Sequence, residues 1–472
     1  MAARRAALQV AVVLLALCAG GIGASPGCRK HVRRVTEYGA VGDGRTLNTA
    51  AFARAVADLG RRAGDGGAAL VVPEGRWLTG PFNLTSHFTL FLHRGAEILA
   101  SQDLEDWPLI APLPSYGRGR DEPGPRYSNF IGGSNLTDVT ISGYNGTING
   151  QGQVWWDKFH AKQLDYTRGY LLELLYSRDI IISNVTFGRA LMEPPPHLLH
   201  IAWLFDHVSV VLTLLACPVL SSNVTISGVT ILAPVHSPNT DGIDPDSSSH
   251  VKIEDCYIVS GDDCIAVKSG WDEYGIKFNM PSQHIVVRRL TCISPTSAMI
   301  ALGSEMSGGI QDVRVEDNTA IDTESAVRIK SGVGRGGFVR DVFVRRLSLH
   351  TMKWVFWMTG NYGQHPDNSS DPKALPEVTG INYRDVFAEN VTMAGRMEGI
   401  PNDPYTGICM SNITAQLAPK AKKLQWNCTD VQGVASGVSP EPCPELGAEG
   451  KPCTFPEEEL VIGPPELPKC TY

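Results

Sequence analysis

Three aspartates on two short turns are the residues of this chain best suited to chemistry. Asp241 follows Asn239 and Thr240 in one turn, and Asp262 and Asp263 stand together in the next turn, with Asp262 21 residues after Asp241. Carboxyl groups that lie close together raise one another's pKa, so one can stay protonated while its neighbours stay ionised. Such a set can protonate a leaving oxygen and activate water, which are the two needs of glycoside hydrolysis.

Two cations follow the acidic turns at a spacing that would bring them into the same groove. Arg328 and Lys330 are two residues apart, so on a strand they share one face. Arg328 can hold a substrate carboxylate through two parallel hydrogen bonds, and Lys330 adds a point charge. Lys268, shortly after the paired aspartates, is a further candidate for substrate binding. Carboxylates beside cations predict a site for an acidic sugar.

The elements that must position these residues are short strands that repeat along the chain. Each copy begins with Asp, Asn or His and continues with β-branched residues that alternate with polar ones. The clearest copies are 138–141, 179–182, 223–226, 250–253, 284–287, 312–315 and 341–344. From Val224 onward the steps are 27, 34, 28 and 29 residues, a period typical of solenoids. We see no amphipathic helical stretch between the copies. We therefore expect an all-β fold, a right-handed parallel β-helix.

Stacking of the coils would bring the candidate residues together. Neighbouring coils lie about 4.8 Å apart. Asp241, Asp262, Ser304 and Arg328 lie 17, 11, 19 and 15 residues after the repeated strand of their coil. We therefore expect four successive coils to present them in roughly the same sector. The alternative interpretation is that the acidic turns are only common coil corners.

The ends of the chain predict a secreted protein with one main domain. Two arginines precede an apolar run and then small residues, the pattern of a signal peptide, which we expect over residues 1–24. We expect a single β-helix domain over residues 32–435, because each coil of a solenoid contacts only its neighbours. A tail rich in Cys and Pro, residues 436–472, would pack over an end coil or be partly loose. Ten cysteines remain after the signal peptide, an even number that permits disulfides.

The composition and one unusual segment argue against nucleic acid and membranes as partners. The net charge is −8, and no basic stripe suggests nucleic acid. Residues 188–221 contain an apolar run, but Asp206 lies near its middle, and a charge there costs about 2.5–3.5 kcal/mol in a membrane. We therefore expect no stable membrane span. Our hypothesis is that this atypical insert comes from an altered exon boundary or a retained intron. We expect a monomer with no metal site and no cofactor.

The motifs resemble those of the plant polygalacturonases, glycoside hydrolase family 28, over roughly residues 32–435. The resemblance is carried by Asn239-Thr240-Asp241, Gly261-Asp262-Asp263 and Arg328-Ile329-Lys330, with support from residues 37–44 and 146–152. It implies a secreted enzyme of the cell wall that hydrolyses α-1,4-linked galacturonate in pectin with inversion.

The resemblance also assigns roles that the residues alone leave open. It implies that Asp262 is the general acid and that Asp241 and Asp263 position and deprotonate the water. Arg328 and Lys330 would bind the galacturonate carboxylate, and Asn239 would support the site. The residues by themselves do not choose which aspartate is the acid.

One motif departs from the family. Ser304, within Gly303-Ser304-Glu305, stands where the family usually carries a histidine. A histidine can relay protons near about pH 6, and a serine cannot. A plant subgroup shares this form, so we interpret the change as subgroup character. We expect Glu305, as the strand neighbour of Ser304, to face away from the cleft.

Two other functions stay open beside the hydrolase. A pectate lyase shares the β-helix and uses Ca²⁺ with an Arg or Lys base. A pectin-binding wall protein with an inactive site is favoured by Ser304 and by the insert, and opposed by the intact aspartates and cations.

Overall fold

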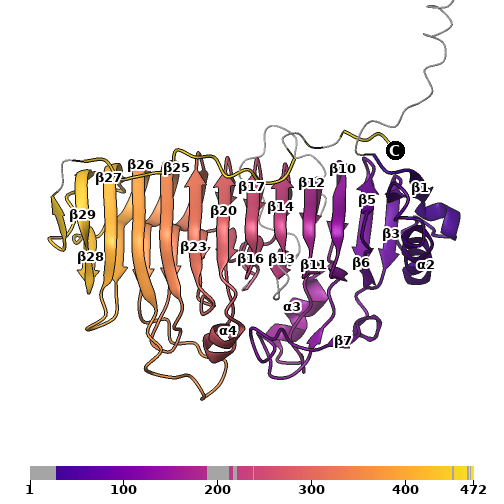
Figure 1. Cartoon of the computed structure of the whole chain (residues 1–472), viewed down its shortest axis with the longest axis horizontal. Coiled ribbons are helices and arrows are strands. Elements are labelled where there is room, and N and C mark those ends of the chain that lie inside the picture. Colours follow the sequence, from indigo (N-terminus) through magenta and orange to yellow (C-terminus); the bar gives the residue numbers. More distant parts are fainter. Residues whose placement is uncertain are drawn as a thin grey trace, which may run out of the picture.

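The computed structural model describes residues 28–188, 212–215, 221–237, 239–448, 451–464, 467 and 469–472. Over these residues the chain forms a long stack of parallel coils (Figure 1). The expected parallel β-helix is confirmed. The predicted signal peptide lies outside the described residues, and so does most of the 188–221 insert.

The coils build three parallel series of strands. The first series contains β1 (His31–Arg34), β2 (Ala68–Val72), β5 (Phe88–Leu92), β10 (Thr137–Asn149), β12 (Arg178–Gly188), β14 (Ser222–Ser227), β17 (Ser249–Glu254), β20 (Ser282–Arg288), β23 (Ile310–Glu316), β25 (Phe338–Thr359), β26 (Glu377–Glu398), β27 (Tyr405–Leu417), β29 (Val431–Ser439) and β30 (Leu446–Ala448).

The second and third series follow along each coil. The second contains β3 (Gly75–Thr79), β6 (Ala96–Ala100), β15 (Thr230–Leu232), β18 (Tyr257–Val259), β21 (Thr291–Ile293) and parts of the longer strands. The third contains β4 (Phe82–Asn83), β9 (Ile131–Ser134), β11 (Leu172–Leu175), β13 (Leu212–Leu215), β16 (Ile243–Asp246), β19 (Ile265–Val267), β22 (Ala298–Leu302), β24 (Thr319–Lys330) and β28 (Trp426–Thr429). The third series forms the floor of the site described below.

The repeated strands stack in the register that the sequence repeat predicts. Ile182 pairs with Ile226, which pairs with Ile253, and the ladder continues to Val287 and Val315. All five side chains are buried in one continuous core. The first residue of each repeated copy adopts a left-handed backbone conformation, as in Asp312 at φ 48°. Asp, Asn and His tolerate this conformation better than other non-glycine residues, which explains why the copies begin with them.

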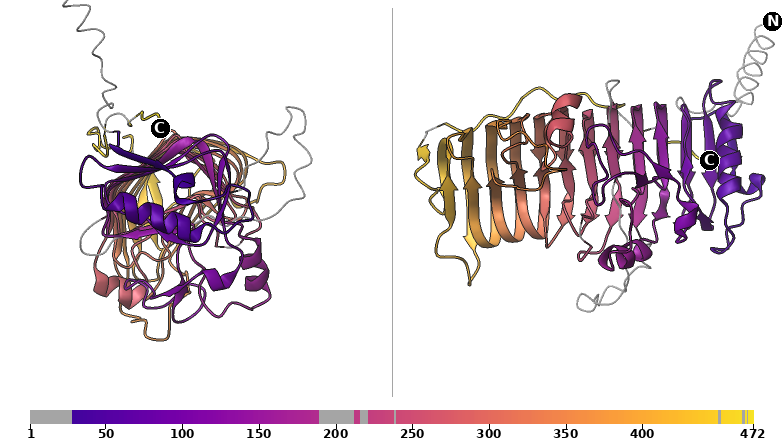
Figure 2. Two further views of the ribbon diagram at one scale, coloured as in Figure 1. Left: turned by 90° about the vertical axis from the view of Figure 1, so that its right-hand side faces the viewer. Right: turned by 90° about the horizontal axis from the view of Figure 1, so that it is seen from below.

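Helices lie at the first end of the stack and in the loops. η1 (Val35–Tyr38) and α2 (Thr49–Gly60) precede the first full coil, and α2 lies across the end of the core (Figure 2). η2 (Leu104–Asp106), α3 (Gln153–His160) and α4 (Asp272–Phe278) lie in loops. The sequence showed no amphipathic helical stretch between the repeated strands, and the structure has two short helices there, α3 and α4. These helices have 8 and 7 residues, too few to give a clear amphipathic period. None of the helices in the described residues has the length and apolar character to cross a membrane.

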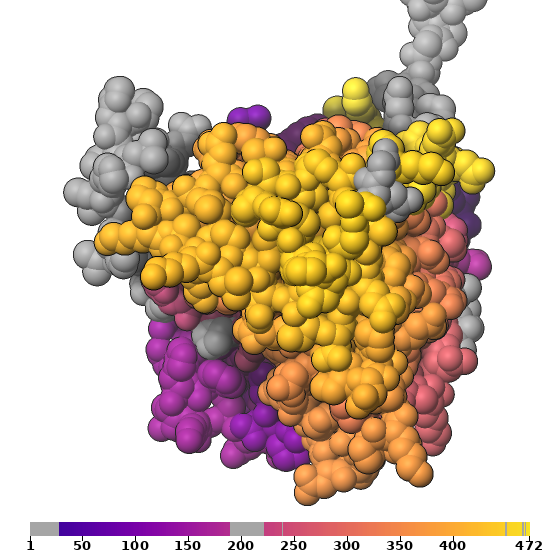
Figure 3. Space-filling view, turned by 90° about the vertical axis from the view of Figure 1, so that its left-hand side faces the viewer, coloured from indigo at the N-terminus to yellow at the C-terminus, as the bar shows by residue number. Residues whose placement is uncertain are grey.

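The tail begins at the last coil, where β30 pairs with β29, and then leaves it. From the last coils, which close the far end of the stack (Figure 3), the chain runs back along the molecule (Figure 1). It is tied to β27 by the disulfide Cys409–Cys453 and to the first coil by Cys28–Cys470. Between these points the Gly463 N–H donates to Asn223 beside β14 (2.6 Å).

Candidate active site

A cavity lies on the outer face of the third series. Its floor comes from the ends of β16, β19, β22 and β24, and its walls come from loops between β6 and β11 and after β25. Ile243 pairs with Ile265, and the ladder continues through Ile300 to Val327. These apolar residues face the core, so the polar residues beside them face outward into the cavity.

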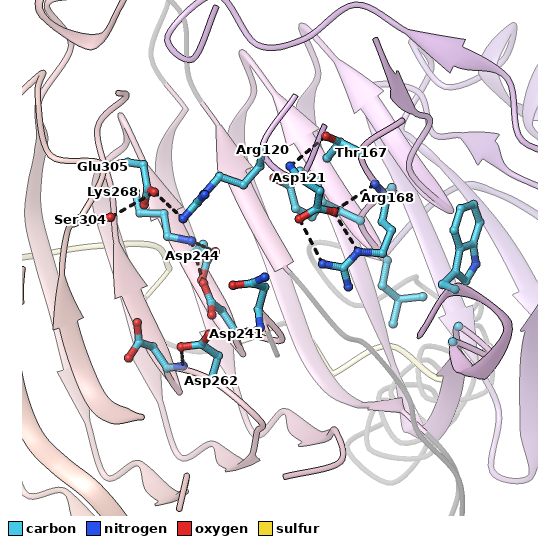
Figure 4. Close-up of a pocket in the computed structure, with 18 of the residues that line it drawn as sticks. Arg120, Asp121, Thr167, Arg168, Asp241, Asp244, Asp262, Lys268, Ser304 and Glu305 are labelled. Carbon is cyan, nitrogen blue, oxygen red and sulfur yellow. Dashed lines mark hydrogen bonds and ion pairs between the residues drawn. The ribbon is translucent and has the colours of Figure 1, made fainter. Parts of the chain in front are cut away.

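The three predicted aspartates meet in this cavity (Figure 4). Asp241 and Asp263 each lie two residues before the paired Ile243 and Ile265, so they occupy equivalent positions on neighbouring coils. One carboxylate oxygen from each of Asp241, Asp262 and Asp263 lies within 4.8 Å of the other two. The sequence aligned Asp241 with Asp262, and the structure shifts that alignment by one residue without separating the cluster.

Arg328 lies three positions further along the floor than the Asp241 and Asp263 positions. It is buried and does not line the cavity. Its Nε donates to Ser325 Oγ (3.1 Å), it forms an ion pair with Glu324, and its guanidinium lies 4.0 Å from the ring centre of Trp357. Its contact with the acidic cluster runs through the Ser297 hydroxyl, 3.3 Å from Nη1. Its role as a substrate ligand stays a prediction.

The neighbours of Asp262 and Asp263 separate their protonation states. Burial, together with the charges of Asp241 and Asp263, raises the pKa of Asp262 to about 6. Burial would also raise the pKa of Asp263, but the charges of Lys330 and Arg328 outweigh it and hold that pKa below its ordinary value. Lys330 Nζ lies 2.6 Å from Asp263 Oδ2. Of this pair, Asp262 is therefore the carboxyl that keeps a proton.

Asp241 is held by a second lysine. Lys268 Nζ lies 2.7 Å from Asp241 Oδ2 and 2.6 Å from Asp244 Oδ2. Burial and the charge of Asp241 raise the pKa of Asp244 well above its ordinary value. Lys268 thus lies between two carboxyl groups, and its role as a substrate ligand stays a prediction. Asn239 is exposed at the rim, where its N–H donates to Asp262 Oδ2 (3.2 Å).

Glu305 lines the cavity, so the prediction that it faces away is wrong. Strand β22 ends at Leu302, and the alternation of a strand no longer applies three residues later. The Ser304 hydroxyl donates to Glu305 Oε1 (3.1 Å), and Arg120 Nη2 lies 3.0 Å from the same oxygen. Burial opposes ionisation of Glu305, but Arg120 and Lys268 hold its pKa well below the ordinary value. The Ser304 hydroxyl is therefore hydrogen-bonded to a carboxylate that stays ionised.

Two arginines that the sequence analysis did not single out also line the cavity. Arg120 comes from the loop between β7 (Leu109–Ile110) and β8 (Arg126–Tyr127), and Arg168 follows α3. Arg168 is paired with Asp121, with its Nε 2.9 Å from Asp121 Oδ2 (Figure 4). Neither arginine belongs to a repeated strand, so the repeat gave no signal for them. Asp244 could have been predicted from the sequence, since it follows Asp241 by three residues in the same acidic segment.

The aromatic residues beside the cavity serve both the wall and the core. Trp155 lines the cavity and belongs to the main core. Its ring centre lies 5.1 Å from that of Trp107 and 4.9 Å from that of Tyr127. Trp155 therefore packs in the core and also presents part of its ring to the cavity.

A parallel β-helix whose cavity holds clustered carboxyl groups is suited to acid/base hydrolysis of glycosidic bonds. Comparison with known proteins agrees. The model of the glycosyl hydrolases family 28 matches residues 213–439. A probable polygalacturonase of Vitis vinifera is 60% identical over 449 residues, covering 94% of this chain and 87% of the relative. A polygalacturonase of Chamaecyparis obtusa is 26% identical, covering 90% of this chain and 74% of the relative.

Solved structures show the same fold. An exopolygalacturonase from Thermotoga maritima superposes with a TM-score of 0.68 at 24% identity, covering 84% of this chain and 92% of the other. The polygalacturonase of Erwinia carotovora gives 0.62 at 20% identity, covering 88% and 99%. The chain belongs to glycosyl hydrolases family 28 and is a glycoside hydrolase that resembles the plant polygalacturonases.

Proposed function

We propose that the protein is a secreted polygalacturonase that hydrolyses α-1,4-galacturonosyl linkages of pectin in the plant cell wall. The observation that carries the proposal is the split protonation of adjacent carboxyl groups. Asp262 keeps a proton up to about pH 6, while Lys330 keeps Asp263 ionised. A protonated acid beside an ionised base is what hydrolysis of a glycosidic bond requires.

In the proposed reaction Asp262 gives its proton to the oxygen of the leaving sugar as the bond from the anomeric carbon to that oxygen breaks. Asp263 and Asp241 hold a water, and one of them takes its proton while the water oxygen bonds to the same carbon. Release of that proton to solvent and return of a proton from solvent to Asp262 complete the cycle. Lys330 in the cavity and Arg328 just outside its lining are proposed to bind the substrate carboxylate, which requires Arg328 to turn toward the cavity. Lys268 is a further ligand, and Asn239 supports the rim of the site.

The resemblance to the family implies that hydrolysis inverts the anomeric configuration. The short distance between the carboxyl groups argues for retention instead. Carboxyl groups in inverting glycosidases usually stand about 6.5–9.5 Å apart, and those in retaining enzymes about 5–5.5 Å apart. The oxygens here lie within 4.8 Å. We propose inversion, because Asp241 and Asp263 can share the water on the side opposite the acid. Nuclear magnetic resonance of the first product settles the point: inversion gives the β-anomer first, and early α-anomer would refute it.

Loss of the family histidine does not remove the acid in this proposal. The pKa of Asp262 is raised by burial and by Asp241 and Asp263, and none of these depends on residue 304. The Ser304–Glu305–Arg120 group instead presents a fixed charge pair at the wall. This supports a working hydrolase over a pectin-binding protein without activity.

The main test is release of reducing ends from polygalacturonate by the protein and by Asp262→Asn. General acid catalysis contributes about 10²–10⁴-fold, so we expect a loss of that size. Asp317→Asn is the matched control, because Asp317 is a surface residue with left-handed φ, which asparagine tolerates. Equal activity of native protein and Asp262→Asn would remove Asp262 as the acid. No reducing ends, with pectin still bound, would favour the binding protein.

The lyase alternative has one observation in its favour, the close carboxylate cluster, which could hold a cation. A lyase would form unsaturated uronides that absorb in the ultraviolet, and EDTA would stop it. We expect reducing ends without that absorbance, and activity that persists in EDTA.

Secretion and the monomeric state are further parts of the proposal. Four disulfides among the described residues fit an oxidising compartment. We expect the exported protein to begin after Ala24, which N-terminal sequencing checks. Size-exclusion chromatography with light scattering is expected to give the mass of a single chain.

A further inference from the structure

A loop from the early coils crosses the cavity and reaches the late coils. Residues 111–125, here called the bridging loop, stand on a short antiparallel stem formed by β7 and β8. Arg118 Nη1 donates to the carbonyl oxygen of Pro366 (3.0 Å), 248 residues away in the chain. Arg120 Nη2 donates to Gln364 Oε1 (3.2 Å). The coils between these contacts carry the acidic cluster, so the loop spans the site.

The middle of the bridging loop is fixed to the floor by buried contacts. Leu113 and Tyr116 form a small apolar cluster with Trp271, separate from the main core. The Tyr116 hydroxyl donates to Asp246 Oδ2 (2.5 Å) at the end of β16, and the Trp271 N–H donates to the carbonyl of Ser115 (2.8 Å). These contacts hold the loop on the strand ends of the floor.

A glycine allows the closest approach of the loop to α4. Gly117 has φ +69°, and a Cβ there would lie 2.2 Å from the ring of Tyr274. The ribbon view shows the loop running below the strands toward α4 (Figure 1). The segment that the loop contacts at its far side, Gln364–Pro366, is also held in place. The buried Arg335 pairs with Asp272 and donates to the carbonyl oxygen of Gln364.

The bridging loop closes the side of the cavity beyond Lys268 and Glu305. Arg120 projects from the loop into the cavity, between Glu305 and the acidic cluster (Figure 4). Its guanidinium stacks 4.7 Å from the ring centre of Trp271, which keeps it in place. A polymer that passes through a site needs a free path on both sides of the scissile bond. A loop that reaches from its stem on the early coils to Pro366, over the coils that carry the acidic cluster, would obstruct one of these paths.

We propose that the bridging loop restricts this enzyme to the ends of its polymer, so that it removes terminal sugars instead of cutting internal bonds. Arg120 is the specificity-determining residue, since it places a cation at the closed side where the carboxylate of a terminal sugar would lie. The inference rests on the proposed hydrolysis of polygalacturonate and adds the place of attack.

The first test follows viscosity and product size during hydrolysis of polygalacturonate. End-directed attack releases the smallest galacturonides from the first minutes, with little loss of viscosity. A ladder of intermediate oligomers, with viscosity halved after a few per cent of bonds are cut, would overturn the inference and leave the hydrolase proposal standing.

The second test opens the loop. Replacing residues 114–122 by three glycines is expected to produce intermediate oligomers and a faster loss of viscosity per bond cut. The control replaces residues 419–423, in a loop between β27 and β28, in the same way and should keep the native product pattern. A bridging-loop variant that melts like the native protein and still releases only terminal sugars would contradict us.

A binding measurement tests the inference without catalysis and without the loop variant, so it holds even if that variant does not fold. Calorimetry on Asp262→Asn with galacturonides of two to ten sugars measures how many sugars the site holds. A site closed on one side gains affinity only over the first few sugars. Affinity that rises steadily to ten sugars would refute end-directed binding. Absence of binding at every length would refute both this inference and the proposed substrate.

The role of Arg120 is tested by the kinetic constants of a variant at this position. For Arg120→Gln we expect KM for di- and trigalacturonide to rise about tenfold or more, with a smaller change in kcat, because a charge-assisted contact to the substrate is lost. If kcat falls and KM stays constant, Arg120 only positions Glu305 and is not a substrate contact.

Discussion

At the scale of single residues, the site works through differences between carboxyl groups that look alike in the sequence. Asp262 and Asp263 are neighbours, yet burial and two carboxylates raise one pKa while Lys330 and Arg328 lower the other. The sequence alone left the choice of acid open. The position of Lys330 makes that choice, because its ammonium group lies 2.6 Å from Asp263 Oδ2 and stabilises the charge of Asp263.

The pH dependence follows from these two groups. Asp262 acts in its protonated form, so kcat/KM is expected to fall about tenfold per pH unit above about pH 6. Asp263 acts in its ionised form, and its lowered pKa places the acidic limb below the ordinary range of an aspartate. A profile of kcat/KM against pH measures both limbs. Activity that stays constant from pH 5 to 8 would show that Asp262 is not the acid.

Removal of the Lys330 charge should move the acidic limb. In Lys330→Met the pKa of Asp263 loses its nearest cation and rises, so the acidic limb is expected to shift to higher pH by a unit or more, on the order of the shifts that a close charge produces. Breaking this buried pair also destabilises the fold by about 3–5 kcal/mol, which thermal melting detects. The exposed Lys423→Met serves as control and should change neither limb nor melting temperature. An unchanged acidic limb in Lys330→Met would argue against the assigned base.

At the scale of elements, each coil is held by its own ladder of β-branched residues. Ile253 is fully buried and pairs with Ile226 on one side and Val287 on the other. The strand also carries Lys252, which lies outside the core in an ion pair with Glu254 (3.3 Å) and is partly buried. One strand therefore offers both a core position and a position outside the core for a stability test.

Ile253→Ala is expected to destabilise the protein by about 2–5 kcal/mol, since it removes buried methyl groups and leaves a cavity. Lys252→Ala on the same strand should change stability by about 0.5 kcal/mol or less. Melting temperature and the midpoint of chemical denaturation compare the two variants. Equal effects would mean that the outward pairs contribute as much as the ladder.

At the scale of the whole molecule, the tail connects the two ends of the stack. The Cys28–Cys470 disulfide joins residues separated by 442 positions, and the Tyr472 hydroxyl accepts from the Arg29 N–H (3.1 Å). A disulfide stabilises mainly by restricting the unfolded chain, more so for longer loops. The tail thus restrains the first coil, although it leaves the stack at the last coil.

Cys28→Ser combined with Cys470→Ser tests this restraint. Chain entropy alone gives about 6 kcal/mol for a loop of this length and about 3 kcal/mol for the 15-residue separation of Cys428–Cys443. We expect a larger fall in melting temperature for the first pair than for Cys428→Ser with Cys443→Ser, and faster proteolysis of the tail. An equal or smaller fall would show that the tail contributes little.

The sequence by itself determined the repeating part of this protein. A left-handed Asp, Asn or His followed by alternating β-branched residues is a local preference written into every coil, so strand positions, register and the acidic cluster could be predicted. Only the tertiary structure decided three other features: the direction of the Glu305 side chain into the cavity, the bridging loop with Arg120, and the path of the tail. These features depend on contacts between segments as far apart as 442 residues. Side chains outside a repeat follow no period in the sequence from which their partners could be predicted.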